Sequence, residues 1–281
     1  MTLIETVKDL RIWRKAAGTV YFVPTMGALH EGHATLIREA RQMAGPDAQV
    51  AASIFVNPLQ FGPNEDFDRY PRTLGADLAI CEQAGADFVF APQVSEVYHT
   101  DRSIQIRESS LSTVLCGASR PGHFDGVCTV VAKLFNLVQP DHALFGKKDY
   151  QQLAIIRRLV RDLDIPVEIH GIDTVREPDG LAMSSRNRYL TPAERAQAPA
   201  LRVALLKARD AWLTGVTGSR RLLEIIHRHL ADEATLGRKD YIAIVDPHTL
   251  QPLDIIQNNG LIALAVFFDK ARLIDNVELV R

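Results

Sequence analysis

The sequence feature that most constrains the fold is an alternation, in the first half of the chain, of short apolar runs with helix-like stretches. The runs are apolar, β-branched or aromatic, as in buried strands, and cover residues 20–23, 50–57, 88–91 and 143–145. Over residues 127–138, apolar positions instead recur with the 3.6-residue period of a helix that buries one face. Buried strands joined by helices predict a parallel sheet with right-handed crossovers, and such sheets bind ligands beyond the carboxyl ends of their strands.

A fifth strand is predicted over residues 167–175, after which the pattern changes. Thr191, Pro192 and Glu194 then give a helix-start signal: an N-cap threonine, a proline at the first helical position and a glutamate three residues after the cap. We expect a long helix to follow this signal.

The last quarter of the chain predicts a small domain. An amphipathic helix is predicted over residues 219–234. Strands of a small mixed or antiparallel sheet are predicted over residues 241–245, 261–268 and 271–280. The sequence therefore predicts an α/β protein: residues 1–175 form a Rossmann-like, doubly wound domain, and residues 176–281 form a smaller α+β domain.

Charge and hydropathy exclude several classes of protein. Thirty-two Lys and Arg residues against 34 Asp and Glu residues give a formal net charge of −2, so no overall basic field indicates nucleic acid or a membrane surface as a partner. The longest purely apolar run, residues 261–268, is far shorter than the roughly 20 residues of a membrane-spanning helix. Since the first residues also lack the pattern of a secretory signal, we expect a cytoplasmic protein.

The first predicted strand is followed by a loop that carries two histidines. His30 and His33 lie three residues apart, with Gly32 between them, at the predicted start of a helix. Backbone N–H groups at a helix start attract anions, and glycines let a ligand approach the main chain, so a phosphate site is the natural inference. A zinc site is disfavoured, because the His-Glu-x-x-His motif places its ligands four residues apart. Two histidines that merely cap a surface loop remain an alternative.

Five segments, taken together and in order, resemble a known family. His-x-Gly-His at residues 30–33 resembles the signature of the nucleotidylyltransferase superfamily, and residues 183–186, Met-Ser-Ser-Arg, resemble its second nucleotide-binding loop. The sequences of the five segments resemble the pantoate–β-alanine ligase family; they are residues 24–33, 55–62, 120–124, 148–152 and 183–187.

The resemblance implies ATP-dependent joining of pantoate to β-alanine, through a pantoyl adenylate, with release of AMP and pyrophosphate. It implies catalytic roles for His30, His33, Lys148 and Arg186, with His33 as a proton donor. The ATP-binding residues that it implies are Met26, Gly27, Ala28, Leu29, His30, Glu31, Gly32, His33, Gly146, Lys147, Lys148, Asp149, Val175, Met183, Ser184, Ser185 and Arg186.

The resemblance also implies the sites of the smaller substrates. Gln60 and Gln152 are expected to bind pantoate, and Gln60 and His123 to lie near β-alanine. An amide suits this task because it donates to a carboxylate and accepts from a hydroxyl without adding a charge. Mg²⁺ is expected because the phosphate charge of ATP must be neutralised, and Asp77 is a candidate ligand.

Two positions depart from the family pattern. Lys147 stands where we expect an acidic or amide residue, and we expect its side chain to face water. Asp125 stands where we expect a basic residue, which weakens any electrostatic inference about the loop at residues 120–124.

Two other functions remain open at this point. One is a nucleotidylyltransferase on the same scaffold that leaves AMP on its product, and the other is an ATP-sensing protein whose small second domain contacts a partner. The resemblance implies a homodimer, and the smaller domain is expected to act as a lid that excludes water from the adenylate.

Overall fold

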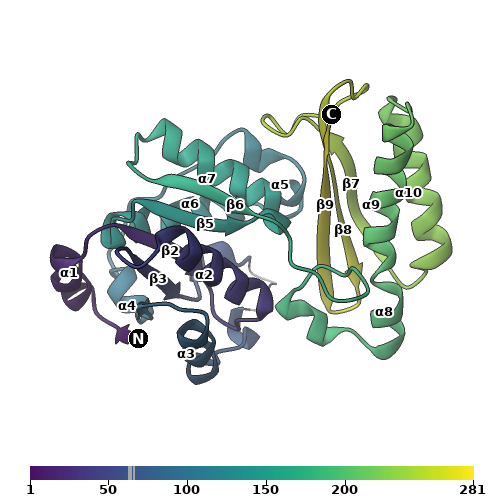
Figure 1. Cartoon of the computed structure of the whole chain (residues 1–281). Coiled ribbons are helices and arrows are strands. Elements are labelled where there is room, and N and C mark those ends of the chain that lie inside the picture. Colours follow the sequence, from purple (N-terminus) through teal and green to yellow (C-terminus); the bar gives the residue numbers. More distant parts are fainter. Residues whose placement is uncertain (63–64, 66) are drawn as a thin grey trace.

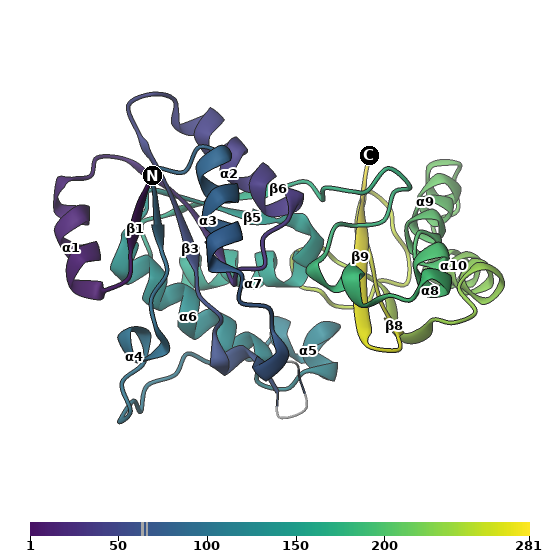
Figure 2. The ribbon, with the colours of Figure 1, turned by 90° about the horizontal axis from the view of Figure 1, so that it is seen from below.

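The computed structural model describes residues 1–62, 65 and 67–281, and its larger part is built on a six-stranded sheet (Figures 1 and 2). The strand order is β1-β4-β3-β2-β5-β6, and every pairing is parallel. The strands are β1 (Thr2–Ile4), β2 (Val20–Thr25), β3 (Gln49–Ile54), β4 (Phe88–Phe90), β5 (His142–Gly146) and β6 (Glu168–Ile172). The predicted parallel sheet is confirmed.

Helices cover both faces of this sheet, because successive strand residues point alternately to opposite sides. The helices of this part are α1 (Val7–Ala16), α2 (Glu31–Ala44), α3 (Leu74–Gln83), α4 (Val94–Val97), α5 (Cys116–Ser119), α6 (His123–Val138) and α7 (Tyr150–Asp162). Phe22 and Phe145 face the core under α6 and α7, whereas Val23 and Leu144 face the core under α2. Two covered faces confirm the doubly wound architecture.

The smaller part of the chain is a three-stranded antiparallel sheet backed by helices (Figure 1). Its elements are α8 (Pro192–Gln197), α9 (Ala200–Leu213), α10 (Ser219–Glu233), β7 (Arg238–Val245), β8 (Asn259–Phe268) and β9 (Ala271–Val280). Trp212 and Phe268 are fully buried in the core between the helices and this sheet. The expected antiparallel sheet and amphipathic helix are therefore present.

Three local predictions need correction. The capping box of Thr191 and Glu194 is present, but α8 ends after six residues and a separate helix, α9, follows it. Pro199 lies at this junction and has no N–H with which to continue the first helix. The predicted strand over residues 50–57 ends at Ile54, since Asn57 caps a 3₁₀ turn and its Oδ1 accepts the N–H of Leu59.

The third correction concerns strand length at one edge of the sheet, where β6 ends at Ile172 rather than near residue 175. The short edge strand β1 was not predicted at all. In the described part of the chain, each helix is too short or too polar to span a bilayer.

The smaller sheet lies beside the carboxyl ends of the parallel strands, where ligands are expected. Asn276 of β9 donates from Nδ2 to the carbonyl oxygens of Lys147 and Lys148, each at 2.9 Å, directly after β5. The Arg176 guanidinium, after β6, forms a bidentate pair with the Asp275 carboxylate at 2.7 and 2.9 Å. These contacts fix one edge of the smaller sheet against the loops that follow β5 and β6.

Candidate active site

The loop after β2 is held by a buried carboxylate. Asp77 of α3 is 1% exposed, and its two oxygens accept the N–H groups of Ala28 at 3.0 Å and Leu29 at 2.8 Å. Gly27 has φ +81°, and a Cβ at this position would lie 3.1 Å from an Asp77 oxygen, so the turn requires glycine. Asp77 therefore fixes the loop that leads into α2.

This geometry corrects the prediction that Asp77 binds Mg²⁺. Both carboxylate oxygens are engaged by backbone N–H groups, and the Thr73 hydroxyl donates to one of them at 3.1 Å. Asp77 lines neither of the two cavities described below. Its carboxylate holds the loop and does not face the cleft in which a metal ion would accompany a nucleotide.

The two histidines lie at the start of α2 in one defined arrangement. The Nδ1 of His30 accepts the N–H of Gly32 at 3.1 Å, and the Nδ1 of His33 accepts the N–H of His30 at 3.3 Å. The rings lie 4.2 Å apart between centroids. Because each Nδ1 accepts a hydrogen bond, the proton of each neutral imidazole resides on Nε2, which remains as a donor.

Both histidines are neutral at physiological pH. Burial, with contributions from Lys148 and Arg188, lowers the pKa of His30 to about 4. Burial and the neighbouring His30 and Lys148 lower the pKa of His33 well below its usual range. A second proton would also have to sit on an Nδ1 that faces a backbone N–H. The pair thus presents two Nε2–H donors in the free protein.

A cavity of about 230 Å³, here called the histidine cavity, brings the predicted segments together. Lys148 links two of its walls, since its ammonium donates to the carbonyl of Met183 at 3.3 Å. Of the predicted ATP-binding residues, those that line it are Met26, His30, Gly32, His33, Gly146, Lys148, Asp149, Val175, Met183, Ser184, Ser185 and Arg186. Segments more than 100 residues apart in sequence thus form one concave site with several hydrogen-bond donors.

The other predicted ATP-binding residues lie outside this lining. Gly27, Ala28 and Leu29 form the turn that Asp77 holds, and Glu31 forms an exposed ion pair with Arg38. The Lys147 side chain is 30% exposed, and its ammonium pairs with Asp173 at 2.8 Å and with Glu278 at 3.4 Å instead of lining the histidine cavity.

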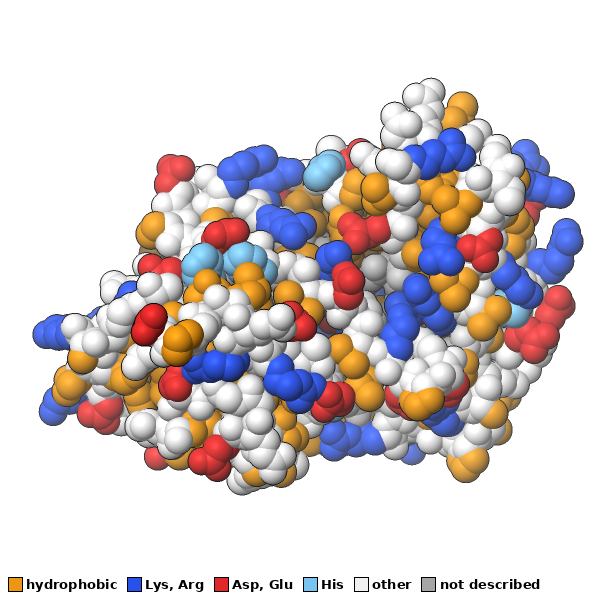
Figure 3. All heavy atoms as spheres, in the orientation of Figure 1, with side chains coloured by type: hydrophobic (Ala, Val, Ile, Leu, Met, Phe, Trp, Pro, Cys, Tyr) orange, Lys and Arg blue, Asp and Glu red, His pale blue; other side chains and the backbone are white. Residues whose placement is uncertain are grey.

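A larger cavity of about 530 Å³ adjoins the first and lies between the two sheets; we call it the interface cavity. Lys148, Asp149, Gln152, Ser184 and Arg186 line both cavities, so the two form one continuous cleft. Figure 3 shows Lys and Arg side chains, with Asp and Glu side chains among them, along the groove between the two parts of the molecule. Arg120, Lys148 and Arg186 line the interface cavity and place cationic groups there.

The predicted pantoate-binding glutamines lie at this cleft. Gln60 is 7% exposed; its Oε1 accepts from Asn57 at 3.1 Å, and its Nε2 lies 2.7 Å from the sulfur of Met26. Gln152 lies in the first turn of α7 and lines both cavities. The two amides are thus presented from β3 and β5, the strands on either side of β2.

His123 is bound to the backbone at Gln60 and lines the interface cavity. Its Nδ1 lies 2.8 Å from the Gln60 carbonyl and its Nε2 lies 3.0 Å from Arg120, which itself pairs with Glu65. Burial, together with Arg120, lowers the pKa of His123 to about 4. Asp125, the other departure from the family pattern, accepts the N–H of Glu108 at 3.1 Å and so holds a neighbouring loop.

Three residues at the site were not singled out from the sequence. Asn57 is 1% exposed and orients Gln60, while the Tyr98 hydroxyl donates to Asn57 Oδ1 at 2.9 Å. Asn276 holds the Lys148 loop, and Arg272 lines the interface cavity beside Asp240. Asn57 lies inside the segment 55–62 and was within reach of sequence analysis, whereas the two β9 residues carry no local signal.

The fold and the cleft define a class of protein: an α/β nucleotide-binding enzyme whose cleft lies at the carboxyl ends of a parallel sheet. The family model described as pantoate-beta-alanine ligase matches residues 2–278. The chain belongs to the pantoate–β-alanine ligase family, and it is an enzyme of the ligase class.

Relatives over the full length agree with this assignment. The chain is 56% identical to the pantothenate synthetase of Akkermansia muciniphila over 263 residues, which cover 92% of each chain. It is 49% identical to that of Thermotoga neapolitana, over 99% of this chain and 100% of the relative.

Solved structures agree as well. The crystal structure of pantothenate synthetase from Thermus thermophilus matches with a TM-score of 0.94 and 48% identity over 100% of both chains. Pantoate-beta-alanine ligase from Francisella tularensis, complexed with beta-gamma ATP and beta-alanine, matches with a TM-score of 0.80 and 34% identity, over 99% of this chain and 97% of that one.

Proposed function

We propose that the chain condenses (R)-pantoate with β-alanine to give pantothenate, in an ATP-dependent reaction that passes through a pantoyl adenylate. The observation that carries this proposal is the convergence of His30 and His33 with residues 183–186 on one cavity that opens into a second. Membership of the pantoate–β-alanine ligase family supports the same reaction. The structure of a relative in complex with beta-gamma ATP and beta-alanine supports both ligands.

In the first step, a carboxylate oxygen of pantoate attacks the α-phosphorus of ATP, and the bond to the β-phosphate oxygen breaks to release pyrophosphate. Negative charge accumulates on the phosphate oxygens during this step, so donors that are already oriented lower the barrier. We assign that task to the Nε2–H groups of His30 and His33, the Lys148 ammonium and the Arg186 guanidinium. Ser184 and Ser185 supply further hydroxyl donors to the phosphates.

The neutral state of the histidines suits this step. A neutral imidazole donates one hydrogen bond without placing a fixed positive charge that would hold the pantoate carboxylate away from phosphorus. The family resemblance implies that His33 is a proton donor, and we assign this role to its Nε2–H group.

In the second step, the amine of β-alanine attacks the acyl carbon of the adenylate, and AMP leaves with the oxygen that had bridged carbon and phosphorus. Gln60 and Gln152 are assigned to the pantoate carboxylate and hydroxyl groups, and Gln60 and His123 to β-alanine. Both glutamines bind without net charge, so they hold pantoate without competing for its nucleophilic oxygen.

The donor set of the cleft fits Mg²⁺ carried by ATP. Magnesium is usually held by one or two carboxylates together with phosphates and waters, and Asp149 supplies a carboxylate that lines both cavities. When bound, the ion would neutralise part of the triphosphate charge.

We further propose that residues 1–175 bind ATP and pantoate and that residues 176–281 close over them as a lid, which brings Ser184, Ser185 and Arg186 to the phosphates. The interface cavity supports this division of tasks, because residues of both parts line it. By family resemblance we also propose a cytoplasmic homodimer, which analytical ultracentrifugation tests.

Exchange of labelled pyrophosphate into ATP tests the proposed reaction. We expect exchange that requires pantoate and proceeds without β-alanine, and we expect all three substrates together to release AMP. Exchange without any dependence on pantoate would refute the substrate assignment. An adenylyl group retained on the final product would identify an AMP-transferring enzyme instead.

A further inference from the structure

Three side chains with metal-binding atoms face one another at the opposite end of the parallel sheet from the cleft. His142 is the first residue of β5, and Glu168 and His170 are the first and third residues of β6. On β5 the histidine cavity is lined by Leu144, Phe145 and Gly146, and the nearest of these, Leu144, is two residues or about 7 Å from His142. None of the three clustered residues lines either cavity, so the cluster is distinct from the residues assigned to ATP.

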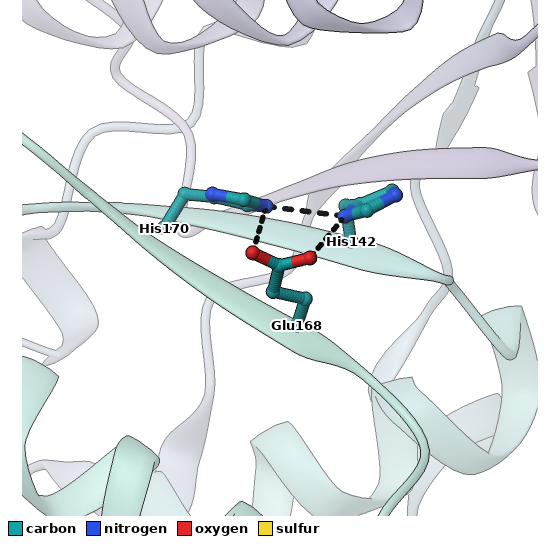
Figure 4. A group of neighbouring side chains, drawn as sticks. All are labelled: His142, Glu168 and His170. Atoms are coloured by element: carbon teal, nitrogen blue, oxygen red, sulfur yellow. Dashed lines mark hydrogen bonds and ion pairs between the residues drawn. The ribbon is translucent and has the colours of Figure 1, made fainter.

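The sheet itself places the three side chains on one face. His142 is the register partner of Glu168 in the parallel pair β5–β6, and His170 follows Glu168 by two residues. Side chains two residues apart on a strand share a face, so all three project to the same side. Figure 4 shows the two imidazole rings and the carboxylate directed toward one another above the strands.

The distances between the ligand atoms match a metal site. His142 Nδ1 lies 3.1 Å from His170 Nε2, and the Glu168 oxygens lie 3.4 Å from the first nitrogen and 3.8 Å from the second. Two ligands bound at about 2.05 Å to a tetrahedral ion lie about 3.3 Å apart. Shifts of a few tenths of an ångström would therefore place all three around one ion.

His142 Nδ1 and His170 Nε2 form a hydrogen bond, in which one of the two neutral imidazoles donates its N–H and the other accepts. If the donating ring carries its proton on the other nitrogen instead, both facing nitrogens and the Glu168 carboxylate are free to bind one metal ion.

The rings are supported and remain reachable. The His142 ring stacks on Tyr21 with centroids 4.2 Å apart and an angle of 19° between the planes, which fixes its orientation. The side chains of His142, His170 and Glu168 are 24%, 19% and 66% exposed, so an ion can enter from solvent and a water can complete its coordination.

We propose that His142, Glu168 and His170 bind a divalent transition-metal ion of the zinc class. Two imidazoles and one carboxylate suit such an ion, whereas Mg²⁺ prefers oxygen ligands. The ion would link the edge strand β6 to β5, the strand with which it pairs in the sheet. Its binding would stabilise the folded chain, because the three ligands are brought together only on folding.

Calorimetric titration of the metal-free protein with ZnCl₂, without ATP, tests this site. We expect one Zn²⁺ per chain with a micromolar Kd and a Tm that rises with zinc concentration. Glu168→Gln should weaken binding about tenfold or more, and the double variant His142→Gln/His170→Gln should weaken it about 100-fold or more. The matched control, His227→Gln on α10, should bind as the unmodified chain does.

Cobalt gives an independent readout, since a tetrahedral Co²⁺–histidine site absorbs visible light and an octahedral aqueous ion does so only weakly. Absence of Zn²⁺ binding below about 100 µM, or binding that the double variant leaves unchanged, would overturn the proposal. If the double variant does not fold, unchanged zinc binding by Glu168→Gln overturns it, because that substitution removes one ligand from a largely exposed side chain.

Discussion

Substitution of Gly32 by alanine should change the geometry of the histidine pair while leaving the stability of the fold nearly unchanged. A Cβ at Gly32 would lie 2.9 Å from Cε1 and 3.0 Å from Nδ1 of His30, whereas ordinary carbon contacts are about 3.5–4.0 Å. The His30 ring must therefore move by about 0.5–1 Å. This movement breaks the hydrogen bond that Nδ1 accepts from the Gly32 N–H and redirects the Nε2–H donor.

The effect on stability should be small because two terms oppose each other. Loss of one hydrogen bond costs about 0.5–1.5 kcal/mol, and replacement of glycine by alanine in a helix contributes about 0.5–1 kcal/mol. The free energy of unfolding should thus change by less than about 1 kcal/mol. Loss of one oriented donor to a developing oxyanion, by contrast, costs about 10²–10³-fold in rate.

The assay is pantoate-dependent exchange of labelled pyrophosphate into ATP, measured beside urea unfolding. We expect Gly32→Ala to slow exchange about 10²–10³-fold, as His30→Ala should, and the double variant to be little slower than either single one. Gly75→Ala is the matched control, since a Cβ there meets no atom within 4 Å. Exchange within threefold of the unmodified rate, or additive effects in the double variant, would refute the assigned role of His30.

Three further predictions follow from the contacts around the cleft. Asp77→Asn should lower Tm by about 3–12 °C, because a buried N–H loses a hydrogen bond to a charged acceptor that contributes about 1.5–3 kcal/mol to stability. A changed Mg²⁺ requirement of the reaction at an unchanged Tm would instead make Asp77 a metal ligand. Asn276→Ala should raise the KM for ATP about 5- to 30-fold, because the variant loses its hydrogen bonds to the Lys148 loop. The control Asn259→Ala, at an exposed position on β8, should leave this KM unchanged. Equal kinetics for both variants would contradict the anchoring role of Asn276. The pKa of His30 is about 4 in the folded chain and near 6.5 in the unfolded chain, so the unfolded chain binds more protons between these pH values. The free energy of unfolding should therefore fall as the pH drops from 6.5 towards 4. His30→Gln should flatten this pH dependence in urea titrations, and an unchanged slope would contradict the low pKa of His30.

Much of the fold follows from periodic sequence patterns. The apolar runs near Val20, Val50 and Ala143 are buried on both faces of a parallel sheet, so they report their strands without help from distant residues. The predicted ends of strands and helices were less accurate, because these ends depend on single residues such as the Asn57 cap and Pro199 between α8 and α9. β1 has three residues and forms by pairing with β4, which no local pattern announces.

The site was predictable where a motif is contiguous and less so where function depends on distant partners. His30 and His33 were found because they adjoin a glycine and a strand end, but their tautomers depend on hydrogen bonds that only coordinates show. The sequence shows only that Asp77 is an acidic residue on a helix, which makes it a candidate metal ligand. Its hydrogen bond to a loop 48 residues away is visible only in the structure. Asn276 reaches the cleft through a pairing across 128 residues.

Isotope transfer from pantoate tests the central claim most directly. If the cleft joins a carboxylate to the α-phosphate and then releases AMP, pantoate labelled with ¹⁸O in its carboxylate must pass one labelled oxygen to AMP for each pantothenate formed. Mass spectrometry of the products of one turnover measures this transfer. We expect one ¹⁸O in AMP and none in pyrophosphate; unlabelled AMP, or label in pyrophosphate, would contradict the adenylate pathway.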